Sequence, residues 1–305
     1  MDHNEKIYRI AFFARKNKLF LCDLLLEYLK QTNNKINGKK VEVEVLDIDR
    51  PIEGCFDIIF HKLDCLSDKD ASYQYLCLYL QNNLSVCCLD PIEKVIQVSD
   101  RRHMGDLFNR MNLEFDGHLI NGAESHLLTI DKGIDKEFSY PQIVKGLDGA
   151  DHDHKFCFTK AGLEMALQQF QTCIAQTYLY HNAIIYKVYV IGDYTWVFKR
   201  PSFSDKEIRD MTQKLQIADV PRISVPSENF DQVLNDTDPD IKFFSKVSHY
   251  IGQISGLQIF GYDLITETNI NKHYIVDINY APSFRGIDSE ELSASLYILF
   301  GHYIK

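Results

Sequence analysis

The sequence predicts an α/β protein, in which a parallel-sheet domain is followed by two α+β units. Three observations support this fold class. Strand-like and helix-like segments alternate over residues 1–98, which is the pattern of βαβ units. Two pairs of apolar strands, within 181–202 and 257–279, are each joined by a short polar turn, as in β-hairpins. Of the 305 residues, 45% are hydrophobic and 25% are charged, so the chain can bury a substantial core.

The first third of the chain is expected to form the parallel sheet. Ligands on such a sheet usually bind beyond the carboxyl ends of its strands. The basic segment 15–18 and the His-Lys-Leu segment 61–63 fall at that edge. The expected strands are 6–14, 39–49, 55–63 and 84–91, and the expected helices are 18–31 and 72–83.

The rest of the chain mixes short strands with longer helices. The helix at 238–256 is the best defined, because Asp238 can cap it, Pro239 suits its first turn and Gly256 suits its end. Segment 115–138 is rich in turns and gives no clear assignment. The buried stripe of the helix is expected to contain Ile241, Phe244, Ile251 and Ile254. The remaining strands are expected at 140–147, 155–159 and 172–180, and the remaining helices at 100–113, 160–170 and 289–304.

Composition and charge argue against several classes of protein. The formal net charge is -10, whereas a duplex nucleic-acid binder usually carries a basic balance or stripe, so no nucleic-acid partner is expected. No stretch of about 18 uncharged apolar residues predicts a membrane span. The first residues do not resemble a secretory signal. The eight cysteines form no Cys-x-x-Cys pair, which favours reduced thiols and a cytoplasmic location.

Oxygen-bearing side chains in two late strands predict a metal site. Asp277 and Asn279 are two residues apart in a strand, so their side chains point to the same face. If the hairpin turns near Ile270, Asp263 lies across from Asp277. Two carboxylates and an amide suit Mg²⁺ that is shared with substrate phosphates. The alternative is a solvated polar face, but an apolar strand should not carry an unpaired carboxylate.

Cationic side chains accompany this cluster. Lys145 and Lys187 lie in apolar strands, and Lys199 and Arg200 close another. One lysine at a strand end is usually only solvated. Two lysines in apolar strands that face a carboxylate cluster indicate phosphate ligands. The glycine-containing loop 148–154 can cover a nucleotide.

Together these stretches resemble a known family along nearly the whole chain. The C-terminal half resembles the ATP-grasp fold. More narrowly, the chain is similar to the inositol 1,3,4-trisphosphate 5/6-kinase family, also called inositol-tetrakisphosphate 1-kinase. Each motif alone is modest, but their shared order is specific. The matching stretches are FHKL (60–63), LDPIEKVIQVSDR (89–101), IVKGL (143–147), DGADHDH (148–154), QTYLYHNAIIYKVYVIGD (176–193), KRPS (199–202), FGYD (260–263) and DIN (277–279).

The resemblance implies an architecture and an activity. Residues 1–98 would form a Rossmann-like inositol-phosphate-binding domain. Residues 99–182 and 183–305 would form two α+β ATP-grasp subdomains with ATP between them. The implied enzyme is a monomeric kinase that uses ATP and Mg²⁺. It would phosphorylate inositol 1,3,4-trisphosphate at position 5 or 6, or inositol 3,4,5,6-tetrakisphosphate at position 1.

The resemblance also implies roles for individual residues. The metal ligands would be Asp263, Asp277 and Asn279. The nucleotide-binding residues would be Arg101, Lys145, Gln176, Tyr178, Lys187, Ser202 and Ser224. The substrate-binding residues would be Lys18, Lys62, His154, Lys187, Asn279 and Ser283. The residues acting on the transferred phosphoryl group would be Lys187, His154 and Arg200.

Three stretches depart from the family pattern, and two other functions stay open. HKLDC lacks the usual threonine after His-Lys-Leu, ADHD puts two carboxylates in the loop, and APSF carries Ser283 where the family has glycine. These changes bear on the acceptor more than on the metal. The first alternative is an ATP-grasp carboxylate-amine ligase. The second is a relative that binds nucleotide or inositol phosphate without turnover.

Overall fold

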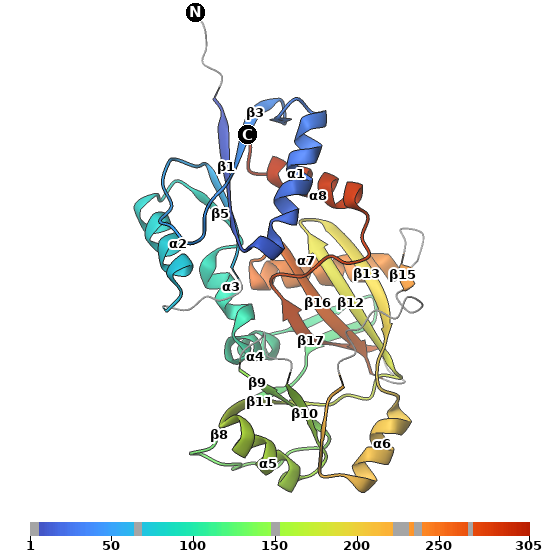
Figure 1. Ribbon diagram of the computed structural model, residues 1–305. Coiled ribbons are helices and arrows are strands. Elements are labelled where there is room, and N and C mark those ends of the chain that lie inside the picture. The colour runs from blue at the N-terminus through green and yellow to red at the C-terminus, as the bar shows by residue number, and fades with distance from the viewer. Residues whose placement is uncertain (1–5, 64–68, 148–152, 222–231, 235–239, 268–270) are drawn as a thin grey trace, which may run out of the picture.

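Three sheets follow one another along the molecule in the computed structural model (Figure 1). The first sheet lies at one end, the second at the other, and the third and largest lies between them. The structure describes residues 6–63, 69–147, 153–221, 232–234, 240–267 and 271–305.

The first sheet has the strand order β2-β3-β1-β4-β5 and is parallel except at the β2–β3 pair. This confirms the predicted parallel sheet. Asp70 caps one of its helices by accepting hydrogen bonds from the backbone of Ser72 and Tyr73. Its strands are β1 (Tyr8–Ala14), β2 (Lys35–Ile36), β3 (Lys39–Val45), β4 (Ile58–Lys62) and β5 (Cys87–Leu89). Its helical segments are η1 (Lys16–Lys18), α1 (Phe20–Gln31), α2 (Ala71–Asn82) and α3 (Ile92–Ser99).

The second sheet is antiparallel, in the order β14-β10-β9-β11-β8. Ser204 and Glu207 form a reciprocal capping box at the start of α6. The strands are β8 (Ser125–Thr129), β9 (Gln142–Gly146), β10 (His154–Cys157), β11 (Thr172–Thr177) and β14 (Ile217–Asp219). The nearby helices are α4 (Arg101–Asn109), α5 (Lys160–Phe170) and α6 (Asp205–Lys214).

The third sheet has the order β15-β13-β12-β16-β17-β7-β6, and helix α7 (Asp240–Ser255) packs on one of its faces. Phe244 and Ile251 of the predicted stripe are buried, while Ile241 and Ile254 are partly buried at its edge. Gly256 ends the helix with a positive φ of 74°, as predicted. The strands are β6 (Asn112–Phe115), β7 (His118–Gly122), β12 (Ile184–Ile191), β13 (Tyr194–Pro201), β15 (Gln232–Leu234), β16 (Ile259–Thr266) and β17 (Lys272–Asn279).

The last helix, α8 (Ser289–Gly301), returns to the first sheet and packs against α1. Phe300 of α8 lies 6.0 Å from Phe12 and 6.2 Å from Phe60, measured between ring centroids. Strands β6 and β7 likewise belong to the third sheet, although they precede the second sheet in the chain. The second and third sheets each contain strands from both sides of 182/183, whereas none of the sheets crosses 98/99 among the described strands. Both proposed boundaries stay a prediction.

Several sequence expectations need correction. The turn-rich segment 115–138 contains β7 and β8, and the expected helix at 100–113 ends at Asn109, before β6 begins. Helices α3 and α6 were not expected. Helix α6 does carry a local signal, since Ser204 and Glu207 form its capping box. Among the described helices, none is long and apolar enough to cross a bilayer.

Candidate active site

A cavity of about 360 Å³ lies between the second and third sheets. Residues of both sheets line it. One part of its lining is apolar and includes Ile143, Tyr178 and Phe203, and another part is strongly charged. Such a combination suits a ligand with a flat apolar group and an anionic tail.

Two carboxylates face each other in the charged part. Asp263 on β16 pairs directly with Asp277 on β17, which confirms the predicted cross-strand neighbours. Asn279 lies two residues further along β17 and lines the same cavity. The register shifts between Asp263 and Leu264, at a β-bulge, and such bulges re-aim side chains. Ile270, where the turn was expected, lies outside the described residues.

Lys187 brings a positive charge to this cluster. It lies opposite Asp263 on β12, and its Nζ is 3.3 Å from Asp263 Oδ1. The Asp263 carboxylate raises the pKa of Lys187 above its usual value. Lys187 is therefore a firmly protonated cation beside the candidate metal ligands.

Asp277 has a different environment. Burial raises the pKa of this carboxyl above its usual value, and Lys145 opposes the rise. Within the described part of the chain, no hydrogen bond or ion pair reaches its oxygens. A half-buried carboxylate without a direct partner is unfavourable, and a bound cation would relieve it. The donor set of Asp263, Asp277 and Asn279 therefore fits Mg²⁺.

The described residues contain no cluster of three or more His, Cys, Asp or Glu that could hold a metal. Two carboxylates and one amide are fewer ligands than an all-protein cage provides. Mg²⁺ commonly takes one or two carboxylates and fills its other positions with water and substrate phosphate oxygens. Asn279 Oδ1 also accepts a hydrogen bond from the backbone of Ala281, at 3.0 Å, which fixes the direction of its amide.

Lys145 approaches from the opposite sheet. Its Nζ donates to Gln176 Oε1 at 2.8 Å and to the Val276 carbonyl at 3.2 Å. Burial lowers the pKa of Lys145, so an anionic ligand would stabilise its charged form. Arg101 Nη1 donates to the Gly146 carbonyl at 2.6 Å and lines the same cavity.

The apolar end of the cavity contains a hydroxyl–imidazole pair that the sequence did not predict. His181 Nδ1 lies 2.7 Å from the Leu179 carbonyl, so Nδ1 carries the hydrogen. Burial lowers the pKa of His181, which favours the neutral ring. Its Nε2 then accepts from Ser202 Oγ at 2.8 Å, and the lone pairs of Ser202 remain to accept from a ligand. The nearby Tyr178 hydroxyl is buried without a hydrogen-bond partner in the described structure.

Most of the predicted site residues meet in this cavity. Eleven line it, from three sequence regions: Arg101, Lys145, His154, Gln176, Tyr178, Lys187, Arg200, Ser202, Asp263, Asp277 and Asn279. Lys18 and Ser283 do not line it, although Lys18 Nζ donates to the Ala281 carbonyl at 2.6 Å. Ser224 and residues 148–152 of the loop lie outside the described residues.

Lys62 differs from its expected place. The resemblance suggests a lysine that reaches substrate phosphates, but Lys62 has a relative exposure of only 1% and does not line the cavity. It lies at the junction of the first and third sheets. The local sequence around Lys62 does not predict this burial, because the residues that cover it come from distant parts of the chain.

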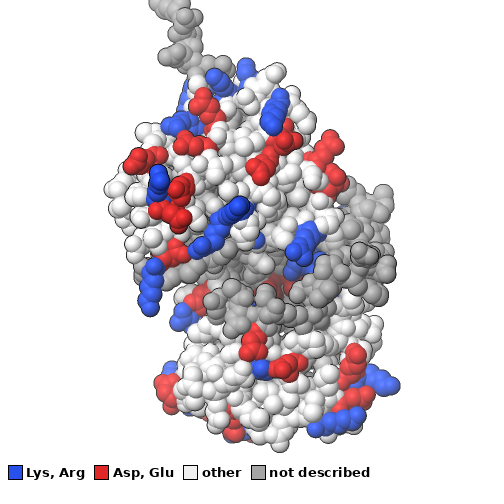
Figure 2. All heavy atoms as spheres, in the orientation of Figure 1, with Lys and Arg blue, Asp and Glu red and all other residues white. Residues whose placement is uncertain are grey.

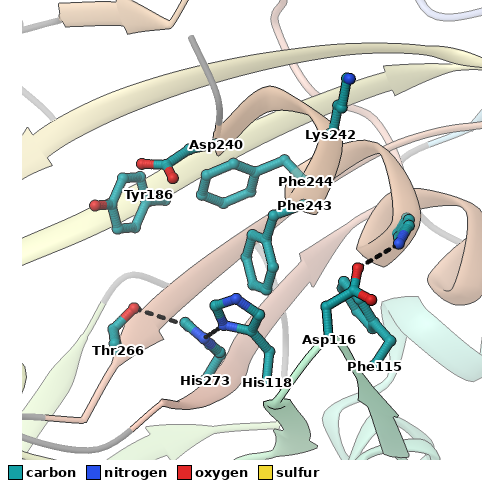
Figure 3. Close-up of a pocket in the computed structure, with 11 residues that line it drawn as sticks. Phe115, Asp116, His118, Tyr186, Asp240, Lys242, Phe243, Phe244, Thr266 and His273 are labelled. Atoms are coloured by element: carbon teal, nitrogen blue, oxygen red, sulfur yellow. Dashed lines mark hydrogen bonds and ion pairs between the residues drawn. The ribbon is translucent and has the colours of Figure 1, made fainter.

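A second cavity, of about 370 Å³, lies on the face of the third sheet that α7 covers (Figure 3). His273 Nε2 is 2.9 Å from His118 Nδ1, and His273 Nδ1 is 3.0 Å from Thr266 Oγ1. The Phe243 ring lies 4.6 Å from the His273 ring and 4.9 Å from the His118 ring. Burial lowers the pKa of His273 to about 4, and His118 adds to this effect. The neutral His273 ring and its contacts with His118 and Phe243 thus help to hold the start of α7 against β7 and β17.

The face of the molecule in Figure 2 shows Lys and Arg interspersed with Asp and Glu.

A family profile and several known proteins are similar to this chain in sequence. The profile of the inositol 1,3,4-trisphosphate 5/6-kinase ATP-grasp domain matches residues 123–298. The chain is 24% identical over 275 residues to an inositol-tetrakisphosphate 1-kinase of Danio rerio, covering 81% of this chain and 68% of the relative. It is 28% identical over 266 residues to inositol-tetrakisphosphate 1-kinase 3 of Glycine max, covering 81% and 73%.

The fold also matches solved ATP-grasp structures. The crystal structure of D-cycloserine synthetase DcsG superposes with a TM-score of 0.58 at 13% identity, and the match covers 97% of this chain and all of that one. At this identity the likeness supports the fold alone. The architecture is thus an α/β ATP-grasp fold, with a mainly parallel first sheet and two further sheets around the cavity.

Proposed function

Because the chain belongs to the inositol 1,3,4-trisphosphate 5/6-kinase family, we propose that it transfers the γ-phosphoryl group of ATP to a hydroxyl group of an inositol polyphosphate. The acceptors proposed are inositol 1,3,4-trisphosphate, at position 5 or 6, and inositol 3,4,5,6-tetrakisphosphate, at position 1. The observation that carries the proposal is the cross-strand set of Lys187, Asp263 and Asp277 at the charged end of the cavity between the sheets.

The ATP-grasp family implies ATP binding. We propose that the base of ATP lies at the apolar end, against Tyr178 and near the Ser202–His181 pair. The triphosphate would then extend toward Lys145 and Lys187. The opposed sheets would exclude water from the reacting phosphate and so strengthen each charge interaction.

Asp263, Asp277 and Asn279 would hold Mg²⁺. When bound, Mg²⁺ neutralises charge on the phosphate oxygens and helps to align them. The protein must also hold the acceptor hydroxyl in line with the γ-phosphorus, because phosphoryl transfer depends mainly on positioning and charge stabilisation.

Lys187, His154 and Arg200 would act on the phosphoryl group that is transferred. Lys187 is held beside Asp263, close to the position proposed for the γ-phosphate. It would therefore stabilise the negative charge that develops on the phosphate oxygens during transfer. His154 pairs with Lys145 across β9 and β10, and Arg200 is the second-last residue of β13; both line the cavity. We propose that these two side chains orient the phosphates of ATP or of the acceptor.

The acceptor would enter from the side of the first sheet. Lys18 lies there and reaches the Ala281 carbonyl, just past Asn279. Ser283 is exposed in the same connection after β17. A polyphosphate has several negative charges, so a cation such as Lys18 on the approach would favour its binding. A monomeric, cytoplasmic enzyme is proposed with this activity, and size-exclusion chromatography would test the monomer.

A turnover assay tests the proposal. The protein is incubated with MgATP and each inositol phosphate separately, and the products are resolved by anion-exchange chromatography. A more highly phosphorylated product, absent with the Asp277→Asn variant, is expected. Phosphate release that requires an added amino acid or peptide would instead identify a carboxylate-amine ligase. ATP binding without any product would identify a non-catalytic relative.

A further inference from the structure

Lys62 is at the end of β4 and is almost completely buried. Its Nζ donates to Asp90 Oδ2 at 2.7 Å, to the Ile259 carbonyl at 2.9 Å and to the Tyr280 carbonyl at 2.9 Å. A lysine ammonium has three hydrogens to donate, so these acceptors use its full capacity. The same Nζ lies 3.7 Å from the centre of the Tyr280 ring.

Asp90 also links the first sheet to the third, through the carboxylate oxygen that does not contact Lys62. Its Oδ1 accepts from the backbone N–H of Gln258 at 2.6 Å and of Ile259 at 3.3 Å. These residues lie at the start of β16, whereas Asp90 directly follows β5 of the first sheet. A buried ion pair is tolerated when every polar atom finds a partner, and here the backbone of the third sheet provides the partners.

His61, beside Lys62, completes the junction. Its Nε2 is 2.8 Å from the Asp90 carbonyl, so Nε2 carries the hydrogen. The Tyr280 hydroxyl donates to the His61 carbonyl at 2.5 Å. Burial lowers the pKa of His61 to about 4, so this ring is neutral near pH 7. The contacts therefore form one network that is ordered without a ligand.

This network ends on the strands that carry the candidate metal ligands. Tyr280 immediately follows Asn279, and Ile259 begins the strand that carries Asp263. The first sheet thus holds one end of β16 and the residue after β17. Lys18 adds a further contact, since it donates to the carbonyl of Ala281, the next residue.

We infer that Lys62 is a positioning residue: paired with Asp90, it docks the first sheet onto β16 and β17 and sets the geometry of Asp263, Asp277 and Asn279. It does not bind acceptor phosphates directly. A phosphate could reach its Nζ only by displacing three hydrogen bonds and leaving Asp90 as an unpaired buried charge. The kinetic test of this inference rests on the proposed kinase function. A second test, which measures MgATP binding and hydrogen exchange, does not require turnover.

The test compares Lys62→Met, Asp90→Asn, the double variant and Lys18→Met. We expect the two single variants at the junction to lower kcat by about 10- to 100-fold and to raise the Mg²⁺ concentration needed for half-maximal rate. The acceptor KM should change less than about threefold. Lys18→Met should show the opposite pattern, with a raised acceptor KM and a smaller change in kcat.

The double variant separates positioning from substrate contact. In Lys62→Met/Asp90→Asn the buried site is neutral, and the amide oxygen introduced in place of the carboxylate would still accept from the Gln258 backbone N–H. The double variant should therefore regain at least about tenfold of the lost kcat, because the effects of a directly interacting pair are not additive. A direct acceptor ligand would give no such recovery.

A second readout does not need the kinase reaction. Isothermal titration of MgATP, and hydrogen exchange at the amides of Gln258 and Ile259, can be measured on each folded variant. Weaker MgATP binding with faster exchange in Asp90→Asn is expected. If the wild-type protein transfers no phosphate, the proposed function fails, while these measurements still decide the role of Lys62.

The inference is overturned if Lys62→Met raises the acceptor KM more than it lowers kcat while Asp90→Asn behaves like the wild type. It is also overturned if Asp90→Asn changes neither MgATP affinity nor exchange. Should Lys62→Met fail to fold, the Asp90→Asn and double variants carry the comparison.

Discussion

Asp263 and Asp277 lie directly across from each other on β16 and β17, and only Asp263 has a lysine within ion-pair distance among the described residues. The two carboxylates are therefore not equivalent. Asp263 is already balanced by Lys187, whereas Asp277 has a raised pKa and no direct partner in the described structure. The unbalanced charge at Asp277 makes it the more informative residue to change.

Asp277→Asn should nearly abolish turnover, by about 10³-fold or more, while the protein stays folded. The substitution keeps the shape of the side chain but removes one of the two negative charges proposed to hold Mg²⁺. Product formation is measured by anion exchange, and folding by circular dichroism. Turnover close to that of the wild type would rule out the metal assignment.

The pKa of Asp277 also predicts a pH effect on stability. Its folded-state pKa is raised, so its contribution to stability is present below its unfolded pKa and is lost as pH rises through the folded value. In metal-free buffer, Asp277→Asn should therefore not lower Tm at pH 7, and Mg²⁺ should raise the Tm of the wild type only. Thermal melts with EDTA or Mg²⁺ check both. A large Tm loss in the variant without metal would contradict the argument.

The Ser202–His181 pair should affect nucleotide binding more than chemistry. Ser202→Ala and His181→Ala should each raise the KM for ATP by about 5- to 20-fold, because one buried hydrogen bond is lost. The double variant should be little worse than either single variant, since both remove the same contact. Steady-state kinetics over ATP concentration provide the measurement, and fully additive losses would show that the residues act separately.

Removing the Tyr280 hydroxyl should weaken the junction between the first and third sheets. Tyr280→Phe deletes the donor to the buried His61 carbonyl and should cost about 1–3 kcal/mol of unfolding free energy. Tyr194→Phe, at an exposed site, is the matched control. Urea unfolding of both variants gives the comparison. Equal stabilities would mean that the hydroxyl bond adds nothing.

The histidines behind the sheet predict acid sensitivity. The folded-state pKa of His273 is lowered from 6.5 to about 4, so its contribution to stability is present above the unfolded value and is lost as pH falls through this range. His273→Gln should flatten the decline of Tm between pH 7 and pH 5. His103→Gln, at an exposed position of α4, should leave the decline unchanged. Parallel slopes for all three proteins would contradict the assignment.

The sequence was most informative where local rules decide the structure. The Asp263–Asp277 pairing followed from strand periodicity and a hairpin, and Gly256 ended its helix as expected. Long-range features were not accessible in the same way. The parallel pairing of β7 with β17 joins segments that are far apart in sequence. Lys62 is buried because Ile259 and Tyr280, far along the chain, cover it, and periodicity contains no information about such neighbours.

Because α8 completes the core of the first sheet, that core cannot form fully until a segment far along the chain has been synthesised. Phe300 packs against both Phe12 and Phe60, but it is synthesised after them and after the second and third sheets. On the ribosome, the N-terminal sheet must wait for the rest of the chain with an open apolar face. Nascent chains of this protein are therefore expected to depend on chaperones until α8 has been synthesised.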